Sequence, residues 1–311
     1  PGGYVLRQAF GHLTRLMIPG EGKTPDEYVL LGSSGVGKSV FTFHLARRAL
    51  REGMMVAMSI RDEVFYWLWP SQSKAGHCYG FTSPNRAHFV SLIKAAAVAR
   101  RGPQQSTVKP VYVIADSCEP LPSIEGVGML LVTTPGYAKW ASALKHNHAQ
   151  PVALGPPTDE ELRAMAKLKK VTIEATNARK KLYGPLPRAL FDFRESPVLE
   201  ALLDEGSAML ASVLDSAGKG LPTGITVYTA DIPSSIMHLT VPDTKDPTRF
   251  EWTMHPGSHE AVVDKLMQKG EAWMNRILHG PGTWLIAPLR GHFWEAWVAR
   301  QLAANAQFQL R

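Results

Sequence analysis

The stretch YVLLGSSGVGKSVFTFHLARRAL, residues 28–50, decides the class of fold. A short apolar run, typical of a buried strand, leads into a loop with three glycines and a lysine. Apolar residues then recur at the spacing of one face of a helix. Residues 32–39 match the pattern G-x-x-x-x-G-K-[ST] in full, and the match follows a strand and opens a helix, as a phosphate-binding loop requires. We therefore predict an α/β fold of the P-loop NTPase type.

The loop residues predict how a phosphate would be held. Glycines let the backbone curl so that its N–H groups converge on phosphate oxygens. Lys38 would reach the β- and γ-phosphates, and the Ser39 hydroxyl would bind Mg²⁺. A glycine turn that binds no ligand is the alternative interpretation. The predicted nucleotide-binding residues run from the first glycine into the helix: Gly32, Ser33, Ser34, Gly35, Val36, Gly37, Lys38, Ser39 and Val40.

Further apolar runs predict the rest of the sheet. They cover residues 54–60, 111–115 (VYVIA), 129–132 (MLLV) and 151–154 (PVAL). Continuous apolar runs of this length, separated by helical patterns, are typical of a parallel sheet covered on both faces. Helices are expected over residues 40–51 and 86–100.

Polar residues follow two of these runs at positions where chemistry is expected. Asp116 closes the run 111–115 and is the candidate acid that would hold Mg²⁺ through water, although a turn or cap residue would look the same. Glu119 would orient or deprotonate the attacking water, unless it is an exposed loop carboxylate. Thr133 or Thr134 would place a hydroxyl against the γ-phosphate or cap the strand end. The predicted catalytic residues are thus Lys38, Asp116, Glu119, Thr133 and Thr134, and the predicted metal ligands are Ser39 and Asp116.

The composition excludes several classes of protein. The 311 residues are 45% hydrophobic and 20% charged, as in a globular protein of one or two domains. The sequence has no apolar run of about eighteen residues and no signal-peptide core, so we expect a soluble intracellular protein. Cys78 and Cys118 are too few for a disulfide framework or a zinc site and are expected to be buried thiols in a reducing compartment. The histidines lack metal-ligand spacing.

Two features leave a structural and a functional interpretation open. The net charge is +7, from 34 Lys and Arg against 27 Asp and Glu, and such an excess favours anionic partners without requiring one. The densest basic segment, residues 167–181, is either a solvated helix face or a contact for nucleic acid. The aromatic run FYWLW at residues 65–69 is either core packing or a platform on which bases stack.

The sequence divides into a P-loop core over residues 1–155 and a helical and mixed region that follows over 156–290. Thr158 and Glu161 form the pattern of a capping box that opens a helix. Residues 156–220 read as mainly helical and 225–254 as β structure, with helices again over 258–278 and 293–304. The run YGPLPRAL, residues 183–190, predicts a rigid bend that presents Arg188 either to a nucleotide or simply at a helix–loop–helix corner.

Taken in order, YVLLGSSGVGKSVF, VYVIADSCEP, LLVTTP, PPTDEELRAM and YGPLPRAL resemble the P-loop ATPase module of Crinkler-type effectors and of the related retrotransposon hot spot proteins. The resemblance covers most of the chain. It implies an AAA+/STAND-like ATPase with an additional-strand core, in which the P-loop strand lies beside the sensor strand. By resemblance, Lys38 and Ser39 take the Walker A positions and Asp116 takes Walker B. The remaining matches are Glu119 near the catalytic acid, Thr133 and Thr134 as sensor, and Pro187 and Arg188 as the helical-domain motif that touches the nucleotide.

The resemblance also implies ATP and Mg²⁺ as ligands and an attached nuclease-like domain directed at DNA. GHFWEAWV at residues 291–298 is similar to the first helix of that domain, with Glu295 as its acid or as a solvated helix residue. The resemblance therefore implies that residues 291–311 are the start of a further domain. The effector branch of the family is delivered into a host cell and its nucleus. This chain departs from the pattern because Ser117, rather than a second acid, follows Asp116, and because no arginine finger can be assigned.

Three functions are compatible with these features. The first is an ATP-hydrolysing module that acts as a nucleotide-dependent switch for an attached effector domain, with a homo-oligomer among its expected partners. The second is a nucleotide-responsive binding or scaffold module with negligible hydrolysis that contacts nucleic acid or host proteins. A small-molecule or nucleotide kinase is the third, but the arginines at residues 47, 48, 100 and 101 do not form an evident lid cluster.

Overall fold

The computed structural model describes residues 5–18, 26–61, 64–70, 78–83, 85–100, 111–119, 121–134, 143, 148–191, 237–254 and 298. The chain divides into two compact units, which are described separately. The first combines residues 1–161 with residues 239–251, and the second comprises residues 162–238 and 252–311. The expected helix over 258–278, the β structure over 225–236 and the motif with Glu295 lie outside the described residues.

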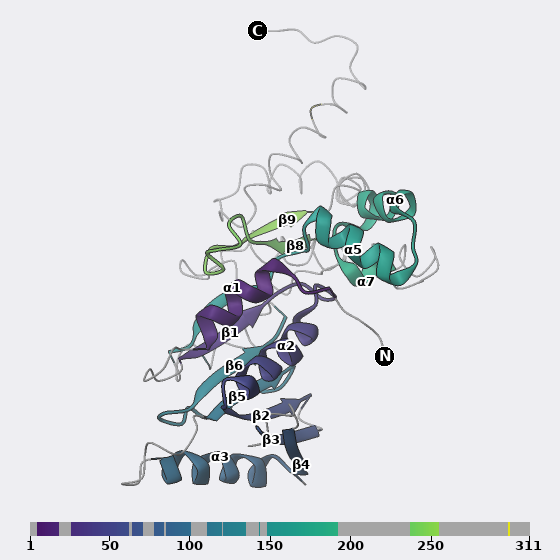
Figure 1. Ribbon diagram of the computed structural model, residues 1–311. Coiled ribbons are helices and arrows are strands. Elements are labelled where there is room, and N and C mark those ends of the chain that lie inside the picture. The colour runs from purple at the N-terminus through teal and green to yellow at the C-terminus, as the bar shows by residue number, and fades with distance from the viewer. Residues whose placement is uncertain are drawn as a thin grey trace, which may run out of the picture. The chain divides into compact units, whose positions relative to one another are not determined.

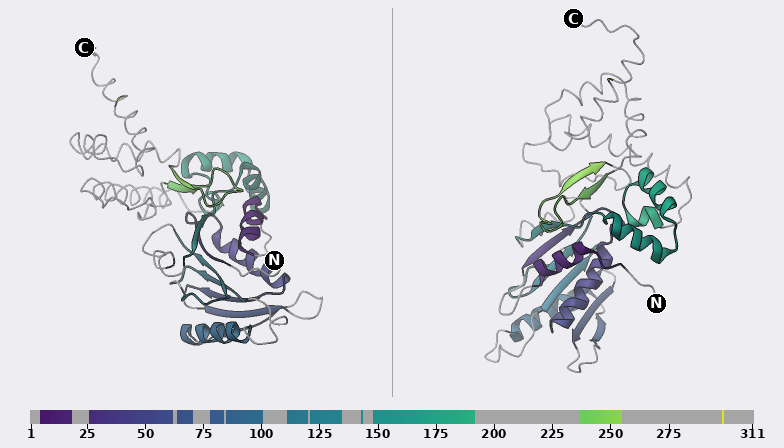
Figure 2. Two further views of the ribbon diagram at one scale, coloured as in Figure 1. Left: turned by 90° about the vertical axis from the view of Figure 1, so that its left-hand side faces the viewer. Right: turned by 45° about the horizontal axis from the view of Figure 1, so that its top comes forward.

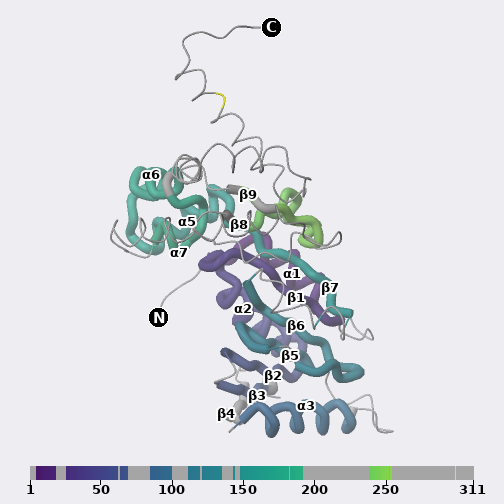
Figure 3. The backbone as a smooth tube through the Cα atoms, turned by 180° about the vertical axis from the view of Figure 1, so that it is seen from behind, coloured from purple at the N-terminus to yellow at the C-terminus, as the bar shows by residue number. Residues whose placement is uncertain are grey.

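The first unit is built on a seven-stranded sheet with the strand order β4-β3-β2-β5-β6-β1-β7 (Figures 1 and 3). Strands β2, β5, β6, β1 and β7 are parallel to their neighbours in this group, whereas β3 and β4 extend one edge in antiparallel pairing. The protein is therefore α/β with a mostly parallel sheet. The strands are β1 (Glu27–Leu31), β2 (Met55–Ile60), β3 (Val64–Pro70), β4 (Cys78–Ser83), β5 (Val111–Asp116), β6 (Gly128–Val132) and β7 (Gln150–Ala153).

Helices cover both faces of this sheet. Helix α1 (Gln8–Met17) packs against α2 (Lys38–Arg51), with the ring centroids of Phe10 and Phe41 5.4 Å apart. Helix α3 (Arg86–Arg100) packs on the other face (Figure 2). The rings of Phe65 and Phe89 lie 5.2 Å apart there. The two helices lie on opposite faces because crossovers between parallel strands are right-handed. The chain crosses the sheet in one direction from β1 through α2 to β2, and in the opposite direction from β4 through α3 to β5.

Burial of the central strands follows from these two helical layers. Every residue of β5 and of β6 is buried. Such strands read as continuous apolar runs, because neither side chain direction meets water. The strands and helices expected from the sequence over residues 28–31, 40–51, 54–60, 86–100, 111–115, 129–132 and 151–154 are confirmed to within a few residues.

The aromatic run at residues 65–69 forms most of β3. Phe65 and Trp67 alternate with half-buried neighbours and are themselves buried. Phe65 contacts α3 rather than solvent. For these two side chains the core-packing interpretation is confirmed.

A short segment from far along the chain completes the first unit. Residues 242–250 form a polar turn in which the carboxylates of Asp243 and Asp246 accept backbone hydrogen bonds from residues two positions later. The turn also pairs with the end of the sheet, since the Ala153 N–H donates to the Pro247 carbonyl at 2.8 Å. On either side of it, β8 (Met237–Thr240) and β9 (Glu251–Met254) form a two-stranded sheet.

The described part of the second unit is a group of short helices. Helix α5 (Asp159–Lys169) begins in the first unit and continues into the second, followed by α6 (Ile173–Tyr183) and α7 (Pro187–Phe191). Their small core consists of Leu162, Ala166, Leu190 and Phe191. Gly184 caps the end of α6 with a φ of 72°, and Pro187 opens α7 at the position that proline favours. The expected bend between the two helices is thus confirmed.

No helix in the described ranges is long and apolar enough to cross a membrane.

Candidate functional site

The glycine loop connects the carboxyl end of β1 to the first turn of α2. Gly37 has a φ of 105° and directly precedes the helix, a backbone conformation that other residues rarely adopt. Gly32 has no room for a side chain, because an added Cβ would lie 3.0 Å from the Leu154 carbonyl oxygen and 3.0 Å from a methyl of Val36. The loop therefore needs glycine for both torsion and space.

Lys38 and Ser39 occupy the first turn of α2. The Lys38 ammonium donates to the carbonyl oxygens of Gly32 at 2.5 Å and of Ser33 at 3.0 Å, so the side chain folds back over the loop. Ser39 is exposed, as is Val40 after it. The N-terminus of α2 and the lysine together concentrate positive potential at the loop.

Asp116 and Thr133 end two neighbouring strands at the same edge of the sheet as the loop. In the register of the parallel strands, Asp116 pairs with Val132, and Val132 pairs with Leu30 just before the loop. Two strand spacings of about 4.8 Å put the backbone of Asp116 roughly 10 Å from β1, with β6 between them. The structure thus brings the predicted acid, the predicted threonine and the glycine loop to one edge.

The turn after β5 fixes the position of Asp116, which is buried. Its carbonyl accepts from the Arg61 N–H at 2.9 Å and from the Cys118 thiol at 3.2 Å. Its carboxylate accepts from the hydroxyl of Ser117, a residue with a φ of 58°. The Cys118 thiol is buried beside the Ser59 hydroxyl at 3.1 Å, as expected of a structural cysteine.

The other predicted catalytic residues have different surroundings. Thr133 is buried, and its N–H donates to the Leu30 carbonyl at 3.1 Å, which holds it against β1. Thr134 is half-buried next to it. Glu119 lies exposed on the loop after β5, where its carbonyl accepts from Arg86 at 3.3 Å.

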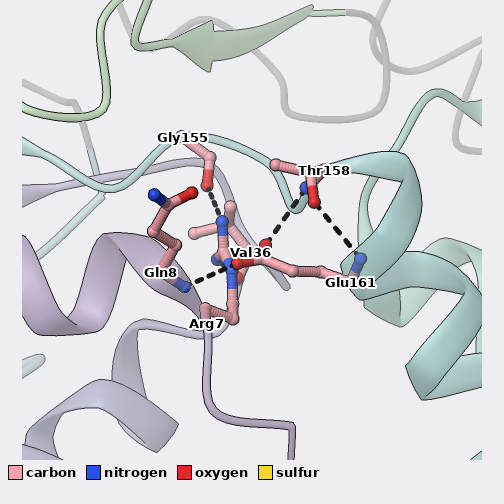
Figure 4. A network of polar contacts seen from close by, with 6 residues as sticks. All are labelled: Arg7, Gln8, Val36, Gly155, Thr158 and Glu161. Carbon is pink, nitrogen blue, oxygen red and sulfur yellow. Dashed lines mark hydrogen bonds and ion pairs between the residues drawn. The ribbon is translucent and has the colours of Figure 1, made fainter.

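An arginine that the sequence pattern does not reveal holds the glycine loop in place (Figure 4). The Arg7 side chain is only 3% exposed and donates to the carbonyls of Val36 at 2.9 Å and Gly155 at 2.7 Å. Its Nε pairs with the Glu161 carboxylate at 3.1 Å. Burial lowers the pKa of Arg7, and the charge of Glu161 opposes that shift. One guanidinium thus ties together the glycine loop, the segment after β7 and the start of α5.

Glu161 is fixed by the capping box that the sequence predicts. Its N–H donates to the Thr158 hydroxyl at 3.2 Å, and its carboxylate accepts the Thr158 N–H at 3.1 Å. The same carboxylate accepts the N–H of Gln8 at 2.7 Å. The capping box is confirmed, and it also orients the acid that Arg7 binds.

A second long-range contact reaches the loop from β8. The Leu239 N–H donates to the hydroxyl of Ser33, which is 1% exposed, at 2.9 Å. Beside Arg7 there is a cavity of about 140 Å³. Its lining includes Arg7, Leu13, Gly155, Thr158, Val241 and Pro247.

Pro187 and Arg188 lie in the second unit, on α7, and Arg188 is exposed. The two predicted metal ligands come from different elements, Ser39 from α2 and Asp116 from the end of β5. Within the described ranges, no group of three or more His, Cys, Asp or Glu side chains could hold a metal ion.

The sequence predictions missed helix α1 and Arg7, and only the helix has a signal in the sequence. Helix α1 carries Phe10, Leu13 and Met17 at helical spacing on its buried face, so its pattern could have been found. Arg7 has no such signal, because its partners lie 29, 148 and 154 residues away along the chain.

Comparison with protein-family models and with curated proteins finds no match to this chain.

Proposed function

We propose that this protein binds and hydrolyses Mg²⁺–ATP and uses the nucleotide as a switch for an attached effector domain. The observation that carries the proposal is the grouping of the glycine loop, Asp116 and Thr133 at one edge of the sheet. Each residue type suits one part of phosphoryl transfer. Backbone N–H groups and Lys38 would bind the phosphates, a carboxylate would hold Mg²⁺, and a hydroxyl would contact the γ-phosphate.

The strand order supports an NTPase of the additional-strand type. Strand β6 lies between β1, which precedes the loop, and β5, which ends in Asp116. This is the arrangement that the resemblance to the Crinkler and retrotransposon hot spot ATPase modules implies, with Thr133 in the sensor position. The AAA+/STAND assignment rests on that order together with the motif sequence.

Binding requires a rearrangement of Lys38. Its ammonium now donates to the carbonyls of Gly32 and Ser33. A phosphate would accept these donors instead, so that the lysine turns from its own loop to the ligand. Mg²⁺, held by Ser39 and through water by Asp116, would neutralise charge on the β- and γ-oxygens. Arg7 would support the loop in this state through its hydrogen bond to the Val36 carbonyl.

Titration of a fluorescent ATP analogue, with and without Mg²⁺, tests the binding step. We expect Lys38→Ala to abolish binding, while Lys94→Ala, which removes an exposed lysine of α3, should leave it unchanged. Unaltered affinity in the Lys38 variant would refute the phosphate site.

Phosphate release tests the hydrolytic step. We expect Glu119→Gln to preserve ATP binding and to slow turnover by roughly 10²-fold or more, the usual effect of losing a general base. The matched control is Glu125→Gln, which changes another exposed loop carboxylate. Equal turnover in both variants would remove Glu119 from the mechanism.

A nucleotide-responsive scaffold with negligible hydrolysis is the second candidate. It is favoured by Ser117, which stands where a second acid would follow Asp116, and by the exposure of Glu119. Tight ATP binding by the unaltered protein without phosphate release, in the presence or absence of DNA, would select this alternative.

A further inference from the structure

The positive charge of this protein is concentrated in one short part of the chain. Residues 162–191 contain eight Lys and Arg residues and one acidic residue, Glu174, and therefore carry a charge of +7. That equals the net charge of the whole chain. The rest of the protein is electrically balanced, so the described part of the second unit carries the entire excess.

Five of these cations form what we term the basic helical surface. They are Arg163, Lys167, Lys169, Lys170 and Lys181, all exposed. Within the described ranges, none of the five makes an ion pair at 4.0 Å or less. Glu174 is the one acidic side chain on these helices in the second unit. Among the residues that the structure describes, no acidic side chain neutralises these five charges at ion-pair distance.

Three of these cations, Lys167, Lys169 and Lys170, lie at one turn, and Arg163 and Lys181 lie farther along the two helices. Helices α5 and α6 are joined by only three residues, 170–172. Lys170 ends α5 in the left-handed conformation with a φ of 56°, and the hydroxyl of Thr172 caps the start of α6 by accepting the N–H of Ala175 at 3.2 Å. Two helices joined by a three-residue turn are the connection that helix-turn-helix motifs use to present a second helix to DNA. Figure 1 shows α5 and α6 meeting at this turn.

Interactions with the helix dipoles explain the positions of only some of these cations. Lysines in the last turns of α5 and α6 interact favourably with the helix C-termini. However, Arg163 lies near the start of α5, and Lys170 lies beyond the helix end. Stabilising two helix ends does not require a segment with eight cations and one anion.

The exposure of the apolar and aromatic side chains between the cations indicates which kind of polyanion this surface suits. Leu168 and Ile173 are 46% and 47% exposed, but the apolar face of α5 is buried in the core of its own unit. A membrane surface would need a continuous apolar face, and single strands would need exposed aromatic side chains for stacking. The aromatic residues of this segment, Tyr183 and Phe191, are half-buried and buried. A duplex needs neither.

We propose that the basic helical surface binds the phosphate backbone of double-stranded DNA. The wide major groove of B-form DNA admits an α-helix, whereas the major groove of duplex RNA is too narrow. Contacts to phosphate position a protein without reading sequence. The surface shares no residue with the glycine loop and binds in the absence of nucleotide.

Fluorescence anisotropy with a labelled duplex of about 20 base pairs, without ATP, tests the proposal on the full chain. Five phosphate contacts predict a slope of log K against log salt of about −4.5. Changing Lys167, Lys169 and Lys170 to Gln should reduce that slope by roughly 2.7 and weaken binding on the order of 100- to 500-fold near 0.1 M salt. The Lys38→Ala variant should bind DNA as the unaltered protein does.

The control removes the same charge elsewhere, by changing the exposed Arg47, Arg48 and Arg51 of α2 to Gln. An equal loss in both triple variants would overturn the proposal, because net charge alone would explain it. Stronger binding to duplex RNA, to single strands or to phosphatidylserine vesicles would also overturn it in favour of that partner. Absence of DNA binding at about 50 mM salt would refute it outright. Circular dichroism confirms that each variant is folded.

Discussion

Arg7 offers the sharpest test of how the glycine loop is held. Replacing it with Leu keeps most of its volume but removes every donor, leaving the carbonyls of Val36 and Gly155 and the Glu161 carboxylate without their partner. Removing one member of a buried ion pair costs about 3 to 5 kcal/mol. Glu161 keeps two backbone donors, from Gln8 and Thr158. We therefore expect the lower part of that range, about 3 to 4 kcal/mol.

Urea and thermal unfolding followed by circular dichroism measure this loss. For a domain of this size, each kcal/mol shifts Tm by about 2 to 4 °C, so Tm should fall by roughly 6 to 16 °C. Arg15→Leu is the control, because Arg15 is exposed on the same helix and should change stability by less than about 0.5 kcal/mol. Arg7→Lys should recover only part of the loss, since an ammonium lacks the planar fork that reaches three acceptors.

Two outcomes would refute this reasoning. One is a loss below about 1 kcal/mol for Arg7→Leu, and the other is an equal loss for Arg15→Leu. A double-mutant cycle with Glu161→Gln should give a coupling energy of about 1 to 3 kcal/mol. Additive effects would show that Arg7 acts through the two carbonyls alone.

Two further predictions concern helix α2 and the glycine loop. Burial, and then the charges of three arginines on α2, lower the pKa of His44, so its protonation disfavours the folded state. Stability should therefore fall as pH drops below about 6.5, and His44→Gln should reduce that fall in urea titrations at about pH 5 and pH 8; an identical pH dependence would contradict it. Gly32→Ala should lower Tm and weaken ATP binding at least tenfold, because the new methyl meets the Leu154 carbonyl. Gly11→Ala in α1, where the methyl has space, should raise Tm instead.

The parts of the fold that could be predicted share a local signal. Strands β5 and β6 are buried on both faces, so each appears as an unbroken apolar run ended by a polar residue. Parallel strands end at a common edge, which is why Asp116 and Thr133 could be placed near the glycine loop from order alone. The capping box of Thr158 and Glu161 is likewise confined to four consecutive residues.

The parts that could not be predicted depend on distant partners. Strand β3 alternates only weakly, because aromatic side chains fill both its buried and its half-buried positions, and its antiparallel pairing with β2 has no separate sequence mark. In the sequence, Arg7 looks like any other cation that precedes a helix. Only the folded structure shows its three acceptors. Residues 239–251 belong to the first unit although the chain leaves that unit at residue 161.

The hydrogen bond from the Leu239 N–H to the Ser33 hydroxyl joins residues 206 positions apart. It therefore cannot form during synthesis until residue 239 has been added to the chain. A ribosome adds about 5 to 20 residues per second, so the roughly eighty residues between the two segments take about 4 to 16 s to appear. During that interval the nascent sheet and its glycine loop are present, but the donor for the Ser33 hydroxyl is not. A chain stalled in this window would carry the whole glycine loop in an unfinished domain, exposed to chaperones and proteases until residue 251 emerges.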